Sequence, residues 1–181
     1  MPHSHRDGLG FFTAGLQKGR DDKLLPAGAD LCKAAEAQSS TNYASISPTD
    51  LVGKTPKGKL HNPYKDTQKD VVAQGQTLFR SYPCSGCHGG SAGGGMCPPL
   101  TSSDWIYGGD DDTLFRLITL GSDALQKQGY TRQGLAAVVG PMPPMGPLFK
   151  SSDDLWKLLA FIRSRYDGDP AYKYGTPATP Q

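Results

Sequence analysis

Two cysteines and a histidine near the middle of the chain are the residues best suited to chemistry. Cys84 and Cys87 are three positions apart and His88 follows directly, which gives the pattern C-x-x-C-H. Two thiols at this spacing, on a turn that leaves a helix, can each form a thioether to one vinyl group of a haem, and the imidazole can then approach the iron. The motif therefore predicts one covalently attached haem c.

Paired cysteines also serve two other chemistries. A structural zinc site needs a second pair of ligands, and no further C-x-x-C or H-x-x-x-H type of pattern follows the motif. A thioredoxin-type redox pair belongs to a βαβ unit, and the sequence shows no such alternation of strands and helices. Both alternatives therefore lack the context that they require.

An iron held by His88 needs a second axial ligand if it is to serve electron transfer. The side chains that could supply it are His3, His5, His61, Met96, Met142 and Met145. Met142 lies in a loop rich in glycine and proline, where the chain has to cross the opposite haem face, and the prolines stiffen the loop around a weak thioether–iron bond. We therefore expect Met142 as the ligand, with Met145 as the open alternative. His/Met ligation favours electron transfer over oxygen chemistry.

The composition excludes several classes of protein. The chain has 181 residues with 19 basic and 17 acidic side chains and no basic cluster, so nucleic acid is not an expected partner. No uninterrupted apolar run exceeds five residues, far short of the roughly 20 that span a bilayer. With 23 glycines and 15 prolines, much of the backbone is expected to be irregular.

Hydrophobic periodicity predicts an all-α domain. Helices are expected around 66–82, 111–120 and 153–166, and Thr67 with Asp70 and Ser151 with Asp154 form capping pairs. Three aspartates, Asp110 to Asp112, lie at the start of the second helix. We interpret them as a helix start and not as a calcium site, because they lack the EF-hand spacing.

The chain divides into three parts in this interpretation. Residues 1–62 form an irregular extension that permits a short helix around 30–38, residues 63–168 form the domain, and residues 169–181 form an extended, proline-rich tail. Three short helices between long loops bury little apolar surface, so the domain needs a further apolar group to form its core. A haem would supply it.

Residues from about 66 to 166 resemble a class I cytochrome c. Gly75 and Phe79 match the first helix of that family, Phe161 matches the aromatic residue of the last helix, and Cys97-Pro98-Pro99-Leu100 matches its proline segment, with Cys97 in place of the usual glycine. The resemblance implies three to five short helices around the haem, with the outer two crossing at Gly75. It also implies that the Pro98 carbonyl accepts the Nδ1–H of His88.

A narrower resemblance concerns the stretches Trp105–Phe115 and Phe161–Pro170. They resemble the cytochrome cL and c550 type, which accept electrons from PQQ-dependent alcohol dehydrogenases. This resemblance implies such a dehydrogenase as donor, a downstream cytochrome or oxidase as acceptor, and a place for Trp105 near a haem propionate. We expect a periplasmic monomeric carrier whose export signal is not visible. The alternatives are a haem-carrying module of a larger dehydrogenase or oxidase complex, and a haem enzyme or sensor with a labile sixth ligand.

Two further cysteines, Cys32 and Cys97, remain after the haem has taken its two thiols. Thioether haem is assembled outside the cytoplasm, where disulfides persist. A Cys32–Cys97 disulfide would join the extension to the domain, closing a loop of about 65 residues and stabilising the fold by roughly 4 kcal/mol. Two buried free thiols are the alternative.

Overall fold

The computed structural model describes residues 42–102, 104–134 and 137–175, and these contain helices but no strand. In chain order the elements are α2 (Pro48–Lys54), α3 (Lys69–Ser81), α4 (Cys84–His88), α5 (Asp111–Leu120), α6 (Ser122–Lys127), the 3₁₀ turn η1 (Gly146–Leu148), α7 (Ser152–Ser164) and the 3₁₀ turn η2 (Pro170–Tyr172). None of the described helices is long and apolar enough to cross a membrane. The all-α prediction is confirmed.

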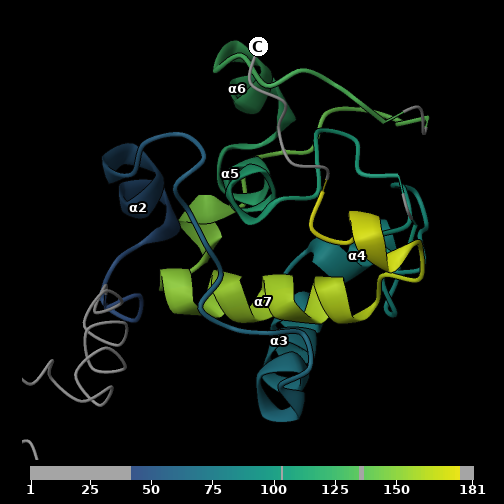
Figure 1. Cartoon of the computed structure of the whole chain (residues 1–181), viewed down its shortest axis with the longest axis horizontal. Helices are drawn as coiled ribbons and strands as arrows, with labels where there is room; N and C mark the ends of the chain where they lie inside the picture. The colour runs from purple at the N-terminus through teal and green to yellow at the C-terminus, as the bar shows by residue number, and fades with distance from the viewer. Residues whose placement is uncertain (1–41, 103, 135–136, 176–181) are drawn as a thin grey trace, which may run out of the picture. The chain divides into compact units, whose positions relative to one another are not determined.

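Helices α3 and α7 pack against each other and cross, in the lower half of the view in Figure 1. A Cβ atom on Gly75 would lie 2.1 Å from the backbone oxygen of Lys157, so only glycine permits this close approach. One turn further on, the rings of Phe79 and Phe161 have centroids 5.3 Å apart, and both are fully buried. The crossing implied by the family resemblance is therefore present.

One of the two predicted capping pairs is confirmed, since the Ser151 side chain accepts a hydrogen bond from Asp154 N at 3.2 Å. At the start of α5, where the sequence predicted a helix start with three aspartates, the Asp110 side chain accepts one from Thr113 N at 2.9 Å. The capping pair expected for α3 was wrong, because this helix begins at Lys69 after Gln68. The Gln68 side chain accepts instead from Lys65 N at 2.7 Å, which leaves the start of α3 without a side-chain cap.

The extension is more regular than expected where it is described. Residues 48–54 form α2, which is capped by Ser47, and the chain around it is bonded to the start of α7: Ser152 N donates to Ile46 O at 2.8 Å and Asp153 N to Tyr43 O at 3.1 Å. The described residues thus lie within one compact unit, Ser40–Gln181, and not beyond a boundary near 62. The helix expected around 30–38 lies outside the described residues.

A buried arginine attaches α2 to α5. Arg116 pairs with Asp112 at 2.9 Å, and its Nη2 donates to Thr55 O at 2.7 Å and to Pro56 O at 3.0 Å. Tyr130 OH donates to the same Asp112 carboxylate at 2.7 Å. Burial alone would raise the pKa of Asp112, but the hydrogen bonds from Arg116, Tyr130 and nearby backbone amides outweigh it and hold the pKa below its ordinary value of 3.8.

A second buried arginine holds the segment after α7. Arg163, 2% exposed, pairs with Asp111 at 2.7 Å and donates to the backbone oxygen of Lys173. Lys173 in turn forms an ion pair with Asp66. The tail was expected to be extended, but its described part contains η2 and is bonded to the domain by these charges.

The crossing at Gly75 makes a direct prediction about stability. Gly75→Ala should lower the free energy of unfolding by roughly 3 kcal/mol, because its Cβ would overlap the α7 backbone. Gly53→Ala in α2 is the matched control, since nothing lies within 4 Å of its Cβ. It should leave stability unchanged or raise it by up to about 1 kcal/mol. Denaturant unfolding of the haem-loaded protein measures both, and equal effects would contradict the assignment.

The lowered pKa of Asp112 predicts a dependence of stability on pH. A group whose pKa is lower in the folded state stabilises the fold above its unfolded pKa and loses that effect as the pH falls through its folded pKa. Asp112→Asn should therefore cost about 3 kcal/mol at pH 7 and flatten the decline of the unfolding free energy below about pH 4. Asp123→Asn is the control, because Asp123 is exposed; it should change the free energy of unfolding by less than about 0.5 kcal/mol. If the unfolding free energy of Asp112→Asn fell with acid as steeply as that of the wild type, this account would be contradicted.

Candidate haem-binding site

The C-x-x-C-H motif forms its own short helix, α4, which follows directly on α3. Helix α3 ends at Ser81 because Pro83 holds Tyr82 in extended backbone, as the sequence predicted. Cys84 and Cys87 then lie three residues apart in helical conformation, a spacing that places both thiols on one face. Cys84 is buried and Cys87 is half-buried, and burial raises the pKa of the Cys84 thiol.

The glycine-rich segment after α4 folds back against the motif. Gly94 N donates to His88 O at 2.9 Å and Cys97 N donates to Cys87 O at 3.0 Å. A Cβ on Gly95 would lie 2.9 Å from Cys87 O, and one on Gly89 would lie 2.5 Å from Gly94 O. Only small residues at these positions let the segment fit closely over α4.

The His88 ring is oriented by the Pro98 carbonyl. His88 Nδ1 lies 2.8 Å from Pro98 O, the contact that the family resemblance implied. A carbonyl oxygen only accepts, so Nδ1 carries a proton, and in the neutral ring Nε2 then keeps its lone pair. Nε2 has no hydrogen-bond partner among the described residues. The ring therefore presents a nitrogen ready to bind a metal, which is how a histidine ligand is normally oriented.

The two candidate methionines lie in a loop bonded to the α5–α6 junction. Met142 N donates to Ser122 Oγ at 3.0 Å and Met142 O accepts from Ser122 N at 2.9 Å, while Met145 N donates to Ile118 O at 2.9 Å. Gly121 permits this contact, because a Cβ there would lie 2.7 Å from Met142 O. Both methionine side chains are partly buried against the core.

The other ligand candidates are placed less favourably. Met96 is 64% exposed and His61 is exposed. His3 and His5 lie outside the described residues. The described part of the chain thus leaves Met142 and Met145 as the methionines next to the core.

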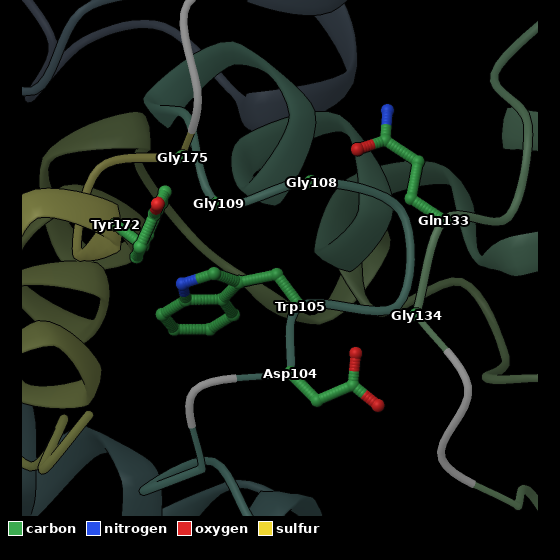
Figure 2. Close-up of a pocket in the computed structure, with 8 residues that line it drawn as sticks. All are labelled: Asp104, Trp105, Gly108, Gly109, Gln133, Gly134, Tyr172 and Gly175. Atoms are coloured by element: carbon green, nitrogen blue, oxygen red, sulfur yellow. The ribbon is translucent and has the colours of Figure 1, made fainter. Parts of the chain in front are cut away.

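Trp105 contributes a buried polar atom without a partner. Its Nε1 is shielded from solvent and makes no hydrogen bond in the described residues, while its ring stacks on Tyr166 with centroids 5.6 Å apart. Trp105 is one of the residues that line a cavity of about 190 Å³, shown in Figure 2; the lining residues are Asp104, Trp105, Gly108, Gly109, Gln133, Gly134, Tyr172 and Gly175. A buried N–H of this kind needs an acceptor, and a haem propionate is an acceptor of the right charge.

These donors fit haem c. The site offers two thiols on one helical face, an imidazole nitrogen with a free lone pair, two thioethers and an unpaired indole N–H. The apolar residues left only partly covered include Leu100, Trp105 and Leu120 beside the two methionines. Partly covered apolar side chains at the edge of a core are what a large flat ring would bury.

The three aspartates at the start of α5 are occupied by protein groups. Asp110 caps the helix, Asp111 pairs with Arg163, and Asp112 pairs with Arg116. No group of three or more His, Cys, Asp or Glu side chains suited to a metal ion occurs in the described residues. Their role as a helix start therefore agrees with the structure.

Comparison with known proteins decides the family. Residues 70–162, slightly more than half of the chain, match the family described as cytochrome c oxidase, cbb3-type, subunit III. The chain belongs to this family of c-type cytochromes. Its helices form a class I cytochrome c fold, and the domain carries covalently bound haem c.

Individual relatives match parts of this chain. The cbb3-type oxidase subunit CcoP of Azospirillum brasilense is 32% identical over 79 residues, covering 40% of this chain and 26% of the subunit. Subunit FixP of Rhizobium meliloti strain 1021 is 32% identical over 117 residues, covering 64% of this chain and 34% of that subunit. The chain thus spans only about a quarter to a third of the length of these relatives. The crystal structure of cytochrome cL from Methylophaga aminisulfidivorans aligns with 64% of this chain and 73% of that one, at 24% identity and a TM-score of 0.44.

Three residues around the cytochrome site were not singled out from the sequence. Ser122 holds Met142, Gly109 lies against the Trp105 ring, and Tyr166 stacks on that ring. Gly109 directly precedes the three aspartates, and Tyr166 is the last residue of the third predicted helix. Nothing in the local pattern indicates which distant residue each one contacts, so only the fold could reveal them.

Proposed function

We propose that this cytochrome domain transfers electrons between proteins, through a haem joined to Cys84 and Cys87 with His88 and Met142 as axial ligands. When bound, haem c supplies an iron that alternates between the ferrous and ferric states. His88 carries the proposal, because its Nδ1–H is committed to Pro98 O and its Nε2 is left for the iron. Met142, held by Ser122, would occupy the remaining position and keep other ligands out.

We further propose a PQQ-dependent alcohol dehydrogenase as the donor and a terminal oxidase, or a cytochrome leading to it, as the acceptor. The support is the resemblance of Trp105–Phe115 and Phe161–Pro170 to the carriers of that pathway. In the structure these two stretches pack together, since Trp105 stacks on Tyr166 and Asp111 pairs with Arg163. In this proposal the protein acts as a monomer in the periplasm, where thioether haem is assembled.

Exposed apolar side chains support docking near the proposed ligands. Six large apolar residues are exposed in the described part of the chain, and four of them follow the motif or flank the methionine loop: Met96, Val138, Val139 and Leu148. Met96 is the neighbour of Cys97, and Val139 is three residues before Met142. We propose that these side chains take part in docking, because electron-transfer partners make small, brief contacts.

A second candidate function is that of a haem-carrying module in a cbb3-type oxidase complex. The match of residues 70–162 to a family of subunits of that oxidase favours it, as do the identities with CcoP and FixP. In this case electrons would reach the domain within an assembled complex, and no free dehydrogenase would be needed.

Replacing the two methionines one at a time tests the ligand assignment. Met142→Ala should abolish the methionine–iron charge-transfer band and lower the reduction potential by about 0.1 V or more, within the roughly 0.8 V that axial ligands control. Met145→Ala is the matched control and should keep the band. Absorption spectra and redox titration of the haem-loaded protein measure both. Loss of the band in Met145→Ala alone would assign the other methionine, and ready CO binding by the reduced wild type would contradict His/Met ligation.

Stopped-flow mixing with a PQQ-dependent alcohol dehydrogenase and its alcohol tests the donor. The oxidised cytochrome should be reduced at a rate proportional to dehydrogenase concentration. Val139→Ser, a change at an exposed docking residue, should slow this reaction several-fold without moving the potential. Reduction no faster than in a mixture without dehydrogenase, together with co-purification in an oxidase complex, would favour the second candidate.

A further inference from the structure

Ser122 binds both polar backbone groups of Met142, the methionine proposed as the second axial ligand. Met142 N donates to Ser122 Oγ at 3.0 Å, and Ser122 N donates to Met142 O at 2.9 Å. The two bonds close a ring between the methionine loop and the first residue of α6, and Ser122 is only 4% exposed. The position of the Met142 backbone therefore depends on one buried residue.

The loop around Met142 has few other hydrogen-bond donors. Four of the seven residues 141–147 are prolines, which carry no backbone N–H. Of the three amides that remain, that of Met142 donates to Ser122 and that of Met145 donates to Ile118 O at 2.9 Å. These two amide bonds attach the loop to α5 and α6, and the Ser122 hydroxyl accepts one of them.

The residue before Ser122 packs closely against the same part of the loop. A Cβ on Gly121 would lie 2.7 Å from Met142 O and 2.8 Å from Pro144 N. Gly121 also has a φ of +76°, in the region that favours glycine. The junction of α5 and α6 thus fits the loop closely, and Ser122 bonds to it at the proposed ligand itself.

We propose that Ser122 is a positioning residue that keeps the Met142 thioether on the haem iron and sets how readily another ligand displaces it. This inference rests on the proposed function, in which Met142 binds the iron. The bond from Met142 N to Ser122 favours the iron-bound arrangement, because the amide of a displaced loop bonds to water instead. Without the hydroxyl, the iron-bound arrangement leaves a partly buried amide unpaired, which shifts the equilibrium towards displacement by about tenfold.

Titration of the oxidised, haem-loaded protein with imidazole measures this equilibrium. Imidazole is a nitrogen ligand that competes with the methionine for the iron, and loss of the methionine–iron charge-transfer band reports the displacement. Ser122→Ala should bind imidazole about tenfold more tightly than the wild type, because its loop leaves the iron more easily.

Ser151→Ala is the matched control. The Ser151 hydroxyl also accepts a hydrogen bond from a backbone amide, that of Asp154 at 3.2 Å, but it does so at the start of α7. Both variants should lower the free energy of unfolding to a similar extent, whereas imidazole affinity should rise only in Ser122→Ala. Wild-type affinity in Ser122→Ala, or an equal rise in both variants, would overturn the proposal.

Hydrogen exchange of the haem-loaded wild type gives a measurement that needs no variant. Saturating imidazole should speed exchange of the Met142 amide about tenfold or more, since displacement of the methionine breaks its bond to Ser122. The Asp154 amide should exchange at an unchanged rate, and an unaltered Met142 amide would overturn the proposal. A charge-transfer band that survives in Met142→Ala would instead contradict the proposed function whatever Ser122 does, so the two failures are distinguishable.

Discussion

The hydrogen bond between His88 Nδ1 and Pro98 O is the constraint on which the site depends. It joins the last residue of the motif helix to a residue ten positions further on, so the segment between them must turn back sharply. Gly89 and Gly95 make that turn possible, because side chains there would collide with backbone. The glycines, the proline and the histidine thus form one unit that fixes both the position and the protonation of the ring.

The features that could be predicted from the sequence are those encoded locally. Ser151 caps its helix as expected, because a capping side chain bonds to an amide only three residues away. The roles of Gly75 and Pro98 follow from the resemblance to a family. A family pattern reflects contacts between distant residues, which local periodicity does not. Helix α2 was missed although Ser47 and Pro48 mark its start, because only two apolar residues follow and no stripe develops. Helix α6 is too short for periodicity to show.

Contacts between distant segments account for the remaining differences. Arg116 and Arg163 read in the sequence as ordinary surface charges of their helices, yet both are almost fully buried. Each is compensated by an aspartate at the start of α5 and by backbone carbonyls from another part of the chain. Buried arginines need such partners, and a one-dimensional pattern does not show where they come from.

The segment before α2 supplies hydrogen-bond acceptors to the first turn of α7. The first amides of α7 have no acceptor within their own helix, and carbonyls of Tyr43 and Ile46 supply one for Asp153 and Ser152. Tyr43 also packs its ring edge-on against Trp156, 6.1 Å away between centroids. A chain trimmed at residue 63 would lack these acceptors and would leave the first turn of α7, the helix that crosses α3, without its partners.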